Sequence, residues 1–280
     1  MLAPSLPVTE ATRVKVEAKL ERKRKINMRA LIISDIHANL PALEAVLAAA
    51  PQYDVVWNLG DTVGYGANPN EVVEMVMKLS GIAVRGNHDR ACSGNFKYGE
   101  YLDFNPTARY AIGWTQKVLC KENTEWLSRL PRGPLRPLGQ KVVCVHGSPR
   151  DEDEYMIFRG DVIDALHRRR AWTTFCGHTH WQAGWSLRGR EVTPLKPEFE
   201  LSDCADQFGV QLHERNRYLL NPGSVGQPRD GDWRAAFAIY DDLQSRLVWY
   251  RVPYNVRVVQ KRIRRAGLPE FLADRLRLGK

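Results

Sequence analysis

Short runs of apolar, β-prone residues alternate with amphipathic segments from residue 29 onward. The runs predict strands at about residues 29–34, 54–59 and 81–85, and the segments between them predict helices near residues 41–50 and 69–79. In the first of these helices, Leu43 and Val46 recur at helical spacing and share one face. Strands that alternate with helices in this order predict a parallel sheet with right-handed crossovers.

The pattern changes beyond residue 100. A helical stretch is predicted over about residues 104–130, and further strands at about 141–146, 173–177, 188–193, 217–220, 234–240 and 246–252. Turns link these later strands in the manner of antiparallel pairing. Two C-terminal helices, near residues 255–266 and 269–277, meet at Gly267 and Pro269, which are typical of a helix end and restart. We expect one domain over residues 28–280.

Residues that can bind metals directly follow several of the apolar runs. Open α/β sheets place their active sites at such strand ends. The five clusters contain Asp35, His37, Asp61, Asn87, His88, His146, His178 and His180. In an extended segment, side chains two residues apart share a face, so Asp35 and His37 can reach the same ion. Carboxylates, an amide oxygen and imidazoles without a thiolate suit Mn, Fe, Zn, Co or Ni better than Ca or Mg.

Cysteine usage and hydropathy indicate the compartment. The chain has five cysteines, an odd number, and none of them forms a CxxC pair. This usage argues against a disulfide framework and for the reducing cytoplasm. No apolar stretch approaches the roughly 18–20 residues that a membrane span needs, and residues 1–27 lack the apolar core of a secretory signal. We therefore expect a cytoplasmic protein without a membrane partner.

The formal net charge of +9 suggests a nucleic-acid partner until its distribution is considered. Residues 1–27 carry a net charge of +4 and residues 251–280 carry +7, which leaves −2 on residues 28–250. The basic excess therefore lies at the ends and not on the body that holds the candidate ligands. We favour a charged leader over residues 1–27, ahead of an alternative start at Met28, over a nucleic-acid track.

Taken together, the clusters resemble the calcineurin-like metallophosphoesterases. All five blocks occur in the order typical of that superfamily, and the loop from Asn221 to Gly226 adds a sixth. Alone, Asp35 could be a helix N-cap and Asn87 a turn former, but such explanations would have to hold independently for every cluster. The resemblance implies an α/β fold, a four-layer α/β/β/α sandwich of two mixed sheets, and is closest to the small bacterial and archaeal phosphodiesterases.

The resemblance also implies how the ligands are shared between two divalent ions. The first ion would be held by Asp35, His37 and His180, the second by Asn87, His146 and His178, with Asp61 bridging them. Mn²⁺ or Fe²⁺ is our first choice, with Zn²⁺, Co²⁺ or Ni²⁺ as alternatives. Two divalent ions beside two carboxylates leave the site positive, so it should attract an anionic phosphate.

Two further residues receive roles from the resemblance. His88 would face the substrate and protonate the leaving oxygen, which a histidine can do near neutral pH. Arg90 could contact a phosphate oxygen or could be an ordinary surface arginine. The expected reaction is in-line attack on phosphorus by a hydroxide that bridges the two ions.

One block departs from the pattern of the Ser/Thr protein phosphatases. That branch carries an aspartate that orients the catalytic histidine and an arginine that grips phosphate, and Gly64 and Tyr65 stand at those positions here. Asp89 could orient His88 instead. We therefore expect phosphodiesters or small nucleotides as substrates, with a protein phosphatase as the alternative enzyme and a non-catalytic metal-bound scaffold as the alternative class.

Overall fold

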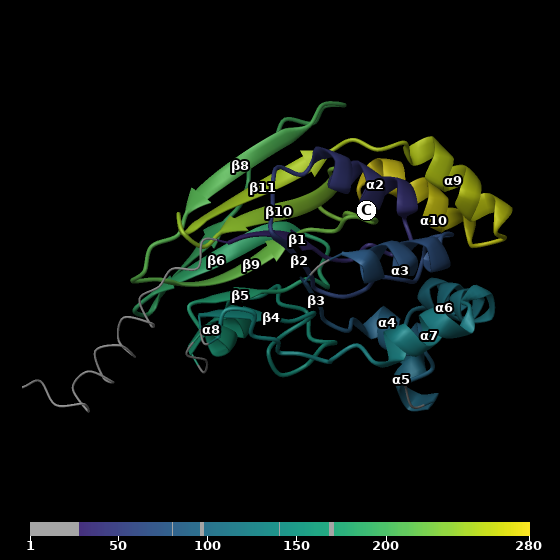
Figure 1. The fold of residues 1–280 in the computed structure, drawn as a ribbon, viewed down its shortest axis with the longest axis horizontal. Helices are drawn as coiled ribbons and strands as arrows, with labels where there is room; N and C mark the ends of the chain where they lie inside the picture. The colour runs from purple at the N-terminus through teal and green to yellow at the C-terminus, as the bar shows by residue number, and fades with distance from the viewer. Residues whose placement is uncertain (1–27, 80, 96–97, 140, 168–170) are drawn as a thin grey trace, which may run out of the picture.

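The computed structural model describes residues 28–79, 81–95, 98–139, 141–167 and 171–280. The predicted leader over residues 1–27 lies outside the described residues. Within the described part of the chain, no helix is both long and apolar enough to cross a membrane. Two β-sheets form the centre of the structure, and most of the helices gather beyond the strand ends (Figure 1).

The first sheet has the strand order β3-β2-β1-β10-β11-β8. Its strands are β1 (Arg29–Ile33), β2 (Val55–Asn58), β3 (Gly81–Ala83), β8 (Asp206–Gln211), β10 (Ala235–Asp241) and β11 (Arg246–Val252). Strands β1, β2 and β3 pair in parallel, as the alternation of strands and helices predicts. The β10 strand pairs antiparallel with both β1 and β11, so the sheet is mixed.

The second sheet has the order β4-β5-β9-β6-β7. Its strands are β4 (Val142–Cys144), β5 (Thr173–Phe175), β6 (Gln182–Arg188), β7 (Glu191–Leu195) and β9 (Arg217–Pro222). Strands β4, β5 and β9 pair in parallel, whereas turn-linked antiparallel strands were expected here. The antiparallel part is confined to β6, which pairs with β7 and with β9.

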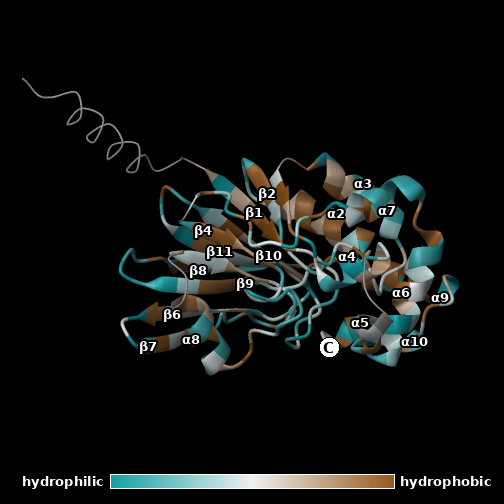
Figure 2. Ribbon diagram, turned by 90° about the horizontal axis from the view of Figure 1, so that it is seen from below, coloured by the Kyte–Doolittle hydropathy of each residue, from teal (hydrophilic) through white to brown (hydrophobic). Residues whose placement is uncertain are grey.

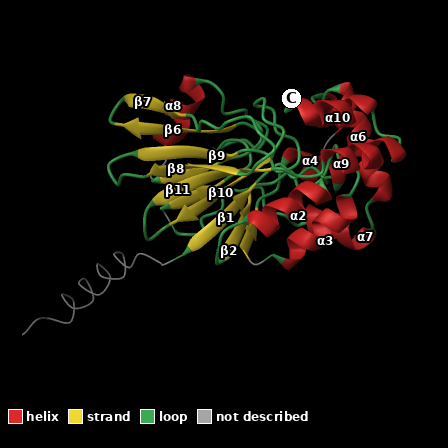
Figure 3. Cartoon of the chain, turned by 90° about the horizontal axis from the view of Figure 1, so that it is seen from above, coloured by secondary structure: helices red, strands yellow, loops and turns green. Residues whose placement is uncertain are grey.

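Alternation along the strands creates the layers. In β1, Leu31 and Ile33 join an apolar cluster with α2 (Leu40–Ala49), α3 (Pro69–Lys78) and α9 (Val256–Arg265). Ala30 and Ile32 point to the opposite face and join the cluster between the two sheets. Helix α8 (Arg159–His167) covers the outer face of the second sheet (Figure 3). The predicted α/β fold of two mixed sheets flanked by helices is confirmed.

Several predicted elements have different bounds. The long helical stretch is two helices, α6 (Pro106–Val118) and α7 (Lys121–Ser128), preceded by the short helices α4 (Asn87–Cys92) and α5 (Tyr98–Leu102). The strand predicted at 188–193 has the wrong bounds: β6 ends at Arg188, Gly189 adopts a φ of +61° in the turn, and β7 begins at Glu191. Neither β8 nor α8 was predicted.

The C-terminal segment packs back onto the first sheet through α9, α10 (Glu270–Asp274) and the 3-10 helix η1 (Arg275–Leu278). Val256, Val259 and Ile263 are buried and form the apolar face of α9. Phe271, in α10, is 58% exposed.

Aromatic side chains fill the space between the sheets. The ring of Phe175 lies 5.8 Å from that of Trp57 and 5.5 Å from that of Tyr240. We expect Phe175→Ala to lower the free energy of unfolding by roughly 3–5 kcal/mol, since it removes buried surface and leaves a cavity. Chemical denaturation measures this loss. The control is Phe158→Ala, because Phe158 is 73% exposed, and it should change stability by less than about 0.5 kcal/mol. Equal losses in the two variants would contradict the packing described here.

Candidate metal centre

The candidate ligands meet where strands of both sheets end. Asp35 and His37 follow β1, Asp61 follows β2, and Asn87 begins α4 after β3. From the second sheet, His146 follows β4, and His178 and His180 follow β5. Largely hydrophilic loops gather at this edge of the sheets, whereas the strands behind them are largely hydrophobic (Figure 2). Carboxyl ends of parallel strands thus supply the site, as in other α/β proteins.

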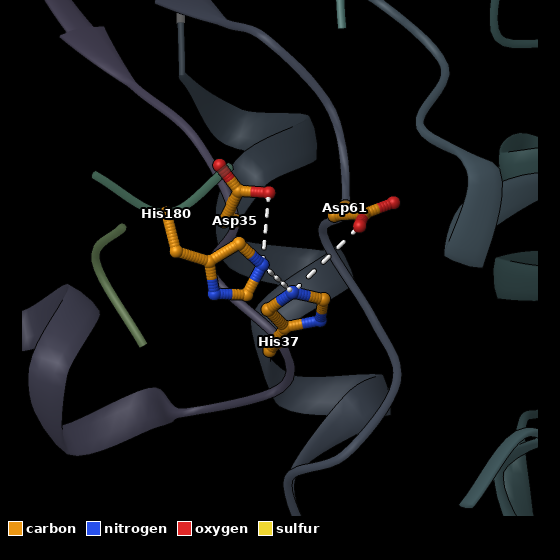
Figure 4. Close-up of side chains that lie close together, drawn as sticks. All are labelled: Asp35, His37, Asp61 and His180. Carbon is orange, nitrogen blue, oxygen red and sulfur yellow. Dashed lines mark hydrogen bonds and ion pairs between the residues drawn. The ribbon is translucent and has the colours of Figure 1, made fainter. Parts of the chain in front are cut away.

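One group of ligands surrounds the first candidate position. Asp35, His37, Asp61 and His180 are all buried, and one ligand atom from each lies within 4.8 Å of the others. The Nε2 atoms of His37 and His180 are 3.0 Å apart. An Asp35 carboxylate oxygen lies 3.4 Å from His180 Nε2, and Asp61 Oδ2 lies 3.7 Å from His37 Nε2. Figure 4 shows these four side chains converging: Asp35 and His37 come from the loop after β1, and Asp61 and His180 come from the loops after β2 and β5.

A second group shares one member with the first. Asp61, His146 and His178 also offer ligand atoms within 4.8 Å of one another. His146 Nε2 lies 3.4 Å from Asp61 Oδ2 and 3.1 Å from Asn87 Oδ1, which brings the amide oxygen to the same point. The structure therefore brings together all seven residues expected to bind metal, with Asp61 between the two groups.

Each of the four histidines in the two ligand groups has one ring nitrogen, here called the outer nitrogen, within hydrogen-bond distance of a backbone carbonyl. The contacts are His37 Nδ1 to Val63 O (3.1 Å), His146 Nδ1 to Leu59 O (2.9 Å), His178 Nε2 to Asp153 O (3.1 Å) and His180 Nδ1 to Gln227 O (2.6 Å). Because a carbonyl can only accept, each outer nitrogen carries the hydrogen. A ring fixed in this way and left neutral presents a lone pair inward, which is the usual arrangement of metal-binding histidines.

The donor set fits divalent cations. Burial lowers the pKa of His37 and His180 well below its usual range and that of His178 to about 3, so these rings are neutral. Two inward lone pairs 3.0 Å apart, on His37 and His180, repel each other unless a cation lies between them. Burial opposes charge on His146, but the Asp61 carboxylate outweighs it and raises the pKa of His146 to about 10. The second group thus also attracts positive charge.

The backbone of the ligand loops is strained. Asp35, His37, Asp61, His178 and His180 all have φ between 48° and 66°, in the left-handed region. Such conformations cost free energy in residues other than glycine and persist at functional sites. Glycines allow these loops to approach one another closely. A Cβ on Gly86 would overlap Asp61 Oδ1, and one on Gly177 would overlap Ser34 Oγ.

His88 lies beside the first group but belongs to neither. Its ring centroid is 4.9 Å from that of His37 and 4.5 Å from that of Tyr65. Its Nδ1 is buried without a hydrogen-bond partner and faces Gly64, where an added Cβ would stand 2.5 Å away. Burial lowers the pKa of His88 to about 4.

The structure does not place Asp89 against the His88 ring. The Asp89 carboxylate accepts hydrogen bonds from the backbone N–H groups of Val63 and Gly86, both at 3.1 Å. It therefore braces two loops of the site, and the suggestion that it orients His88 is wrong. Burial raises the pKa of Asp89 to about 7.

Arg90 points to two acidic residues. It pairs with Glu152 and, at 3.0 Å, with Asp153. The expected contact between Arg90 and phosphate stays a prediction, and a substrate would have to compete with these carboxylates.

Sequence reasoning missed Arg229 and Tyr155. The Arg229 guanidinium carbon lies 5.8 Å from the centroid of the Tyr65 ring, and Arg229 N donates to His180 O at 3.4 Å. The Tyr155 ring stacks on His178 with centroids 3.9 Å apart. The signal for Arg229 was its place just beyond the loop that ends at Gly226, which itself contacts the site: Ser224 Oγ donates to Asp35 O at 2.8 Å.

Two stacked sheets with a buried cluster of carboxylates and imidazoles at their strand ends define a metal-binding α/β protein. Residues 28–213 match the calcineurin-like phosphoesterase family, and the chain belongs to this family. The resemblance to metallophosphoesterases is therefore confirmed, and membership implies a phosphoester hydrolase.

Three relatives span nearly the whole chain. An uncharacterized protein of Methanocaldococcus jannaschii is 36% identical over 253 residues, which are 89% of this chain and 97% of the relative. The crystal structure of a metallophosphoesterase from Sphaerobacter thermophilus has a TM-score of 0.77 and 40% identity, covering 90% of this chain and 99% of that one. A hypothetical protein from Pyrococcus horikoshii shares the fold at 18% identity, with a TM-score of 0.68 and coverage of 90% and 98%.

Proposed function

We propose that the protein is a dinuclear metal-dependent phosphoesterase that hydrolyses phosphodiesters or small nucleotides. The observation that carries this proposal is Asp61, which belongs to both ligand groups and can join two cations. Mn²⁺ or Fe²⁺ remains our first choice for these positions, because the donors are imidazoles and oxygens without a thiolate. When bound, such ions would supply an activated water and stabilise charge on the phosphoryl oxygens.

The residues of the chain have separate tasks in this proposal. Asp35, His37 and His180 hold one ion, Asn87, His146 and His178 hold the other, and Asp61 bridges them. His88 gives a proton to the leaving oxygen. Because burial lowers the pKa of His88 to about 4, the ring is neutral in the free protein at pH 7. A phosphate anion bound next to the ring would raise that pKa, so the proton is taken up as substrate binds.

The surroundings of His88 favour this substrate class over phosphoproteins. Nδ1 faces Gly64 and has no carboxylate to orient it, and Tyr65 stands where protein phosphatases of the family carry arginine. A scaffold without turnover would have no use for His88, a buried histidine that lies beside the metal ligands without being one of them. These observations support a diesterase or nucleotidase ahead of both alternatives.

A hydrolysis panel tests the proposal. Protein reconstituted with Mn²⁺, Fe²⁺ or Zn²⁺ should hydrolyse bis-p-nitrophenyl phosphate and small nucleotide esters faster than a phosphoserine peptide. Protein carrying Asp61→Asn, purified in parallel, controls for contaminating phosphatases. Faster turnover of the phosphopeptide would favour the protein phosphatase, and no turnover by a chain with two bound ions would favour the scaffold.

A further inference from the structure

A cavity of about 260 Å³ lies on the outer face of the second sheet. Ala183 and Trp185 line it from β6, where residues two apart point to the same side of the sheet. Their paired partners on β9 are Asn221 and Leu219, which also line the cavity. Leu219 belongs to the apolar cluster beneath α8, so this side is the outer face of the sheet. The cavity lies where β6 begins and β9 ends, which is the edge that carries the ligand loops.

The walls of this cavity belong to the same loops as the metal centre. One wall is the loop after β5, where Thr179 stands between the two ligand histidines and Trp181 follows them. Met156 contributes to the other wall. It is next in sequence to Tyr155, whose ring stacks on that of His178 with centroids 3.9 Å apart. The cavity therefore begins next to the metal centre.

The lining of the cavity suits a flat group without positive charge. Trp181 and Trp185 offer aromatic surface, and Trp181 is 45% exposed. The polar side chains are engaged within the protein, because Asn221 Nδ2 donates to Thr179 Oγ1 at 3.0 Å. Among the described residues that line the cavity, Lys196 is the one that carries a charge. A ligand held here therefore gains mainly from stacking and meets no carboxylate that would attract a cation.

The volume of the cavity limits what can occupy it. About 260 Å³ is near the lower end of the range for small-molecule sites, roughly 300–1,000 Å³. A planar ring system fits this space, whereas a helix, with a diameter of about 10–12 Å, does not. Aromatic side chains commonly hold bases by stacking, because every base has a π-face. The lining and the size together favour a nucleobase.

We infer that this cavity holds the nucleobase of the substrate while the metal centre holds its phosphate. The inference rests on the proposed function and narrows the substrates to nucleotides and their esters. The base stacks on Trp181, and the exposed Lys196 donates to a carbonyl oxygen or ring nitrogen at the edge of the base. A phosphate ester without a base makes none of these contacts and binds more weakly.

Calorimetric titration of the metal-loaded protein with AMP and with ribose 5-phosphate tests the base site. The two probes share the phosphate and the sugar, and a hydroxyl group replaces the base in ribose 5-phosphate. The unmodified protein should bind AMP more tightly by on the order of 10- to 100-fold, the range expected for stacking of a base on aromatic side chains. In Trp181→Ala, most of this advantage of AMP should disappear, and the affinity for ribose 5-phosphate should stay unchanged.

A second variant tests the same cavity without altering a residue adjacent to a ligand. Ala183→Phe fills the cavity with a larger side chain, so AMP should again lose its advantage while ribose 5-phosphate binds as before. Phe271→Ala is the control, because it removes an exposed aromatic ring on α10, outside the cavity. It should bind both probes as the unmodified protein does. Thermal melting and metal analysis verify that each variant is folded and keeps its ions.

Two results would overturn the base site. One is equal binding of AMP and ribose 5-phosphate by the unmodified protein, and the other is a preference for AMP that persists in both Trp181→Ala and Ala183→Phe. Turnover of bis-p-nitrophenyl phosphate by the unmodified protein separates this failure from that of the proposed function. If the base site alone is wrong, that ester is still hydrolysed. If the proposed function is wrong, metal-loaded protein does not hydrolyse it at all.

Discussion

Replacing Asp61 by asparagine should empty or weaken both metal positions at once. Asp61 is the member common to the two ligand groups, and its carboxylate lies within 3.7 Å of His37 Nε2 and His146 Nε2. The amide keeps the shape but removes the negative charge between two cations. We expect the unmodified protein to hold close to two ions per chain after loading with Mn²⁺ or Fe²⁺. Turnover of the variant should fall on the order of 10³-fold, the scale of losing a group that stabilises transition-state charge.

Elemental analysis after gel filtration measures the metal content. Asp242→Asn serves as the control, because Asp242 is an equally buried carboxylate that pairs with Lys141 at the other end of the first sheet. It should keep both ions even if the protein becomes less stable. One ion or none in the unmodified protein, or two firmly bound ions in Asp61→Asn, would contradict the assignment.

The sequence predicts the site better than it predicts the sheets. Each ligand follows an apolar run directly, and the run decides where its strand ends. Since parallel strands align their carboxyl ends, Asp35 and Asp61 had to meet once β1 and β2 paired. The candidate ligands are buried because the loops that carry them converge where strands of both sheets end.

Which strands pair in a sheet depends on contacts between segments that are distant in the sequence, and local sequence patterns do not predict these contacts. The turn-linked segments beyond residue 140 predicted antiparallel neighbours, yet β5 pairs in parallel with β9, more than 40 residues away. Strand β8 was missed because every second residue along it is exposed and the others are only half-buried, so it carries no strong apolar signal.

The partners of the charged side chains could not be predicted from the sequence either. Nothing in the local sequence of Arg90 indicates that Glu152, 62 residues later, takes its charge. Nor does it indicate that Arg229 comes to lie by the Tyr65 ring. The absence of the arginine of the phosphatase pattern was visible in the sequence, but the position of Arg229 near Tyr65 became visible only in the fold. Charged residues at a site are therefore assigned with confidence only when their neighbours are known.

His88→Ala should retain both metal ions and lose most of its turnover. The His88 ring lies beside the first ligand group without joining either group, so its removal takes no ligand from the cations. If His88 protonates the leaving oxygen, hydrolysis of an alkyl diester should slow by roughly 10²–10⁴-fold, the usual contribution of general acid catalysis. Hydrolysis of the corresponding nitrophenyl ester should slow much less, because nitrophenolate leaves without a proton. Steady-state rates on the two esters, with metal content measured in parallel, give the comparison.

A variant of an exposed histidine, His213→Ala, serves as the control and should match the unmodified protein on both esters. Loss of metal from His88→Ala, or equal slowing with both leaving groups, would remove the acid role from His88 and make it a structural or metal-binding residue.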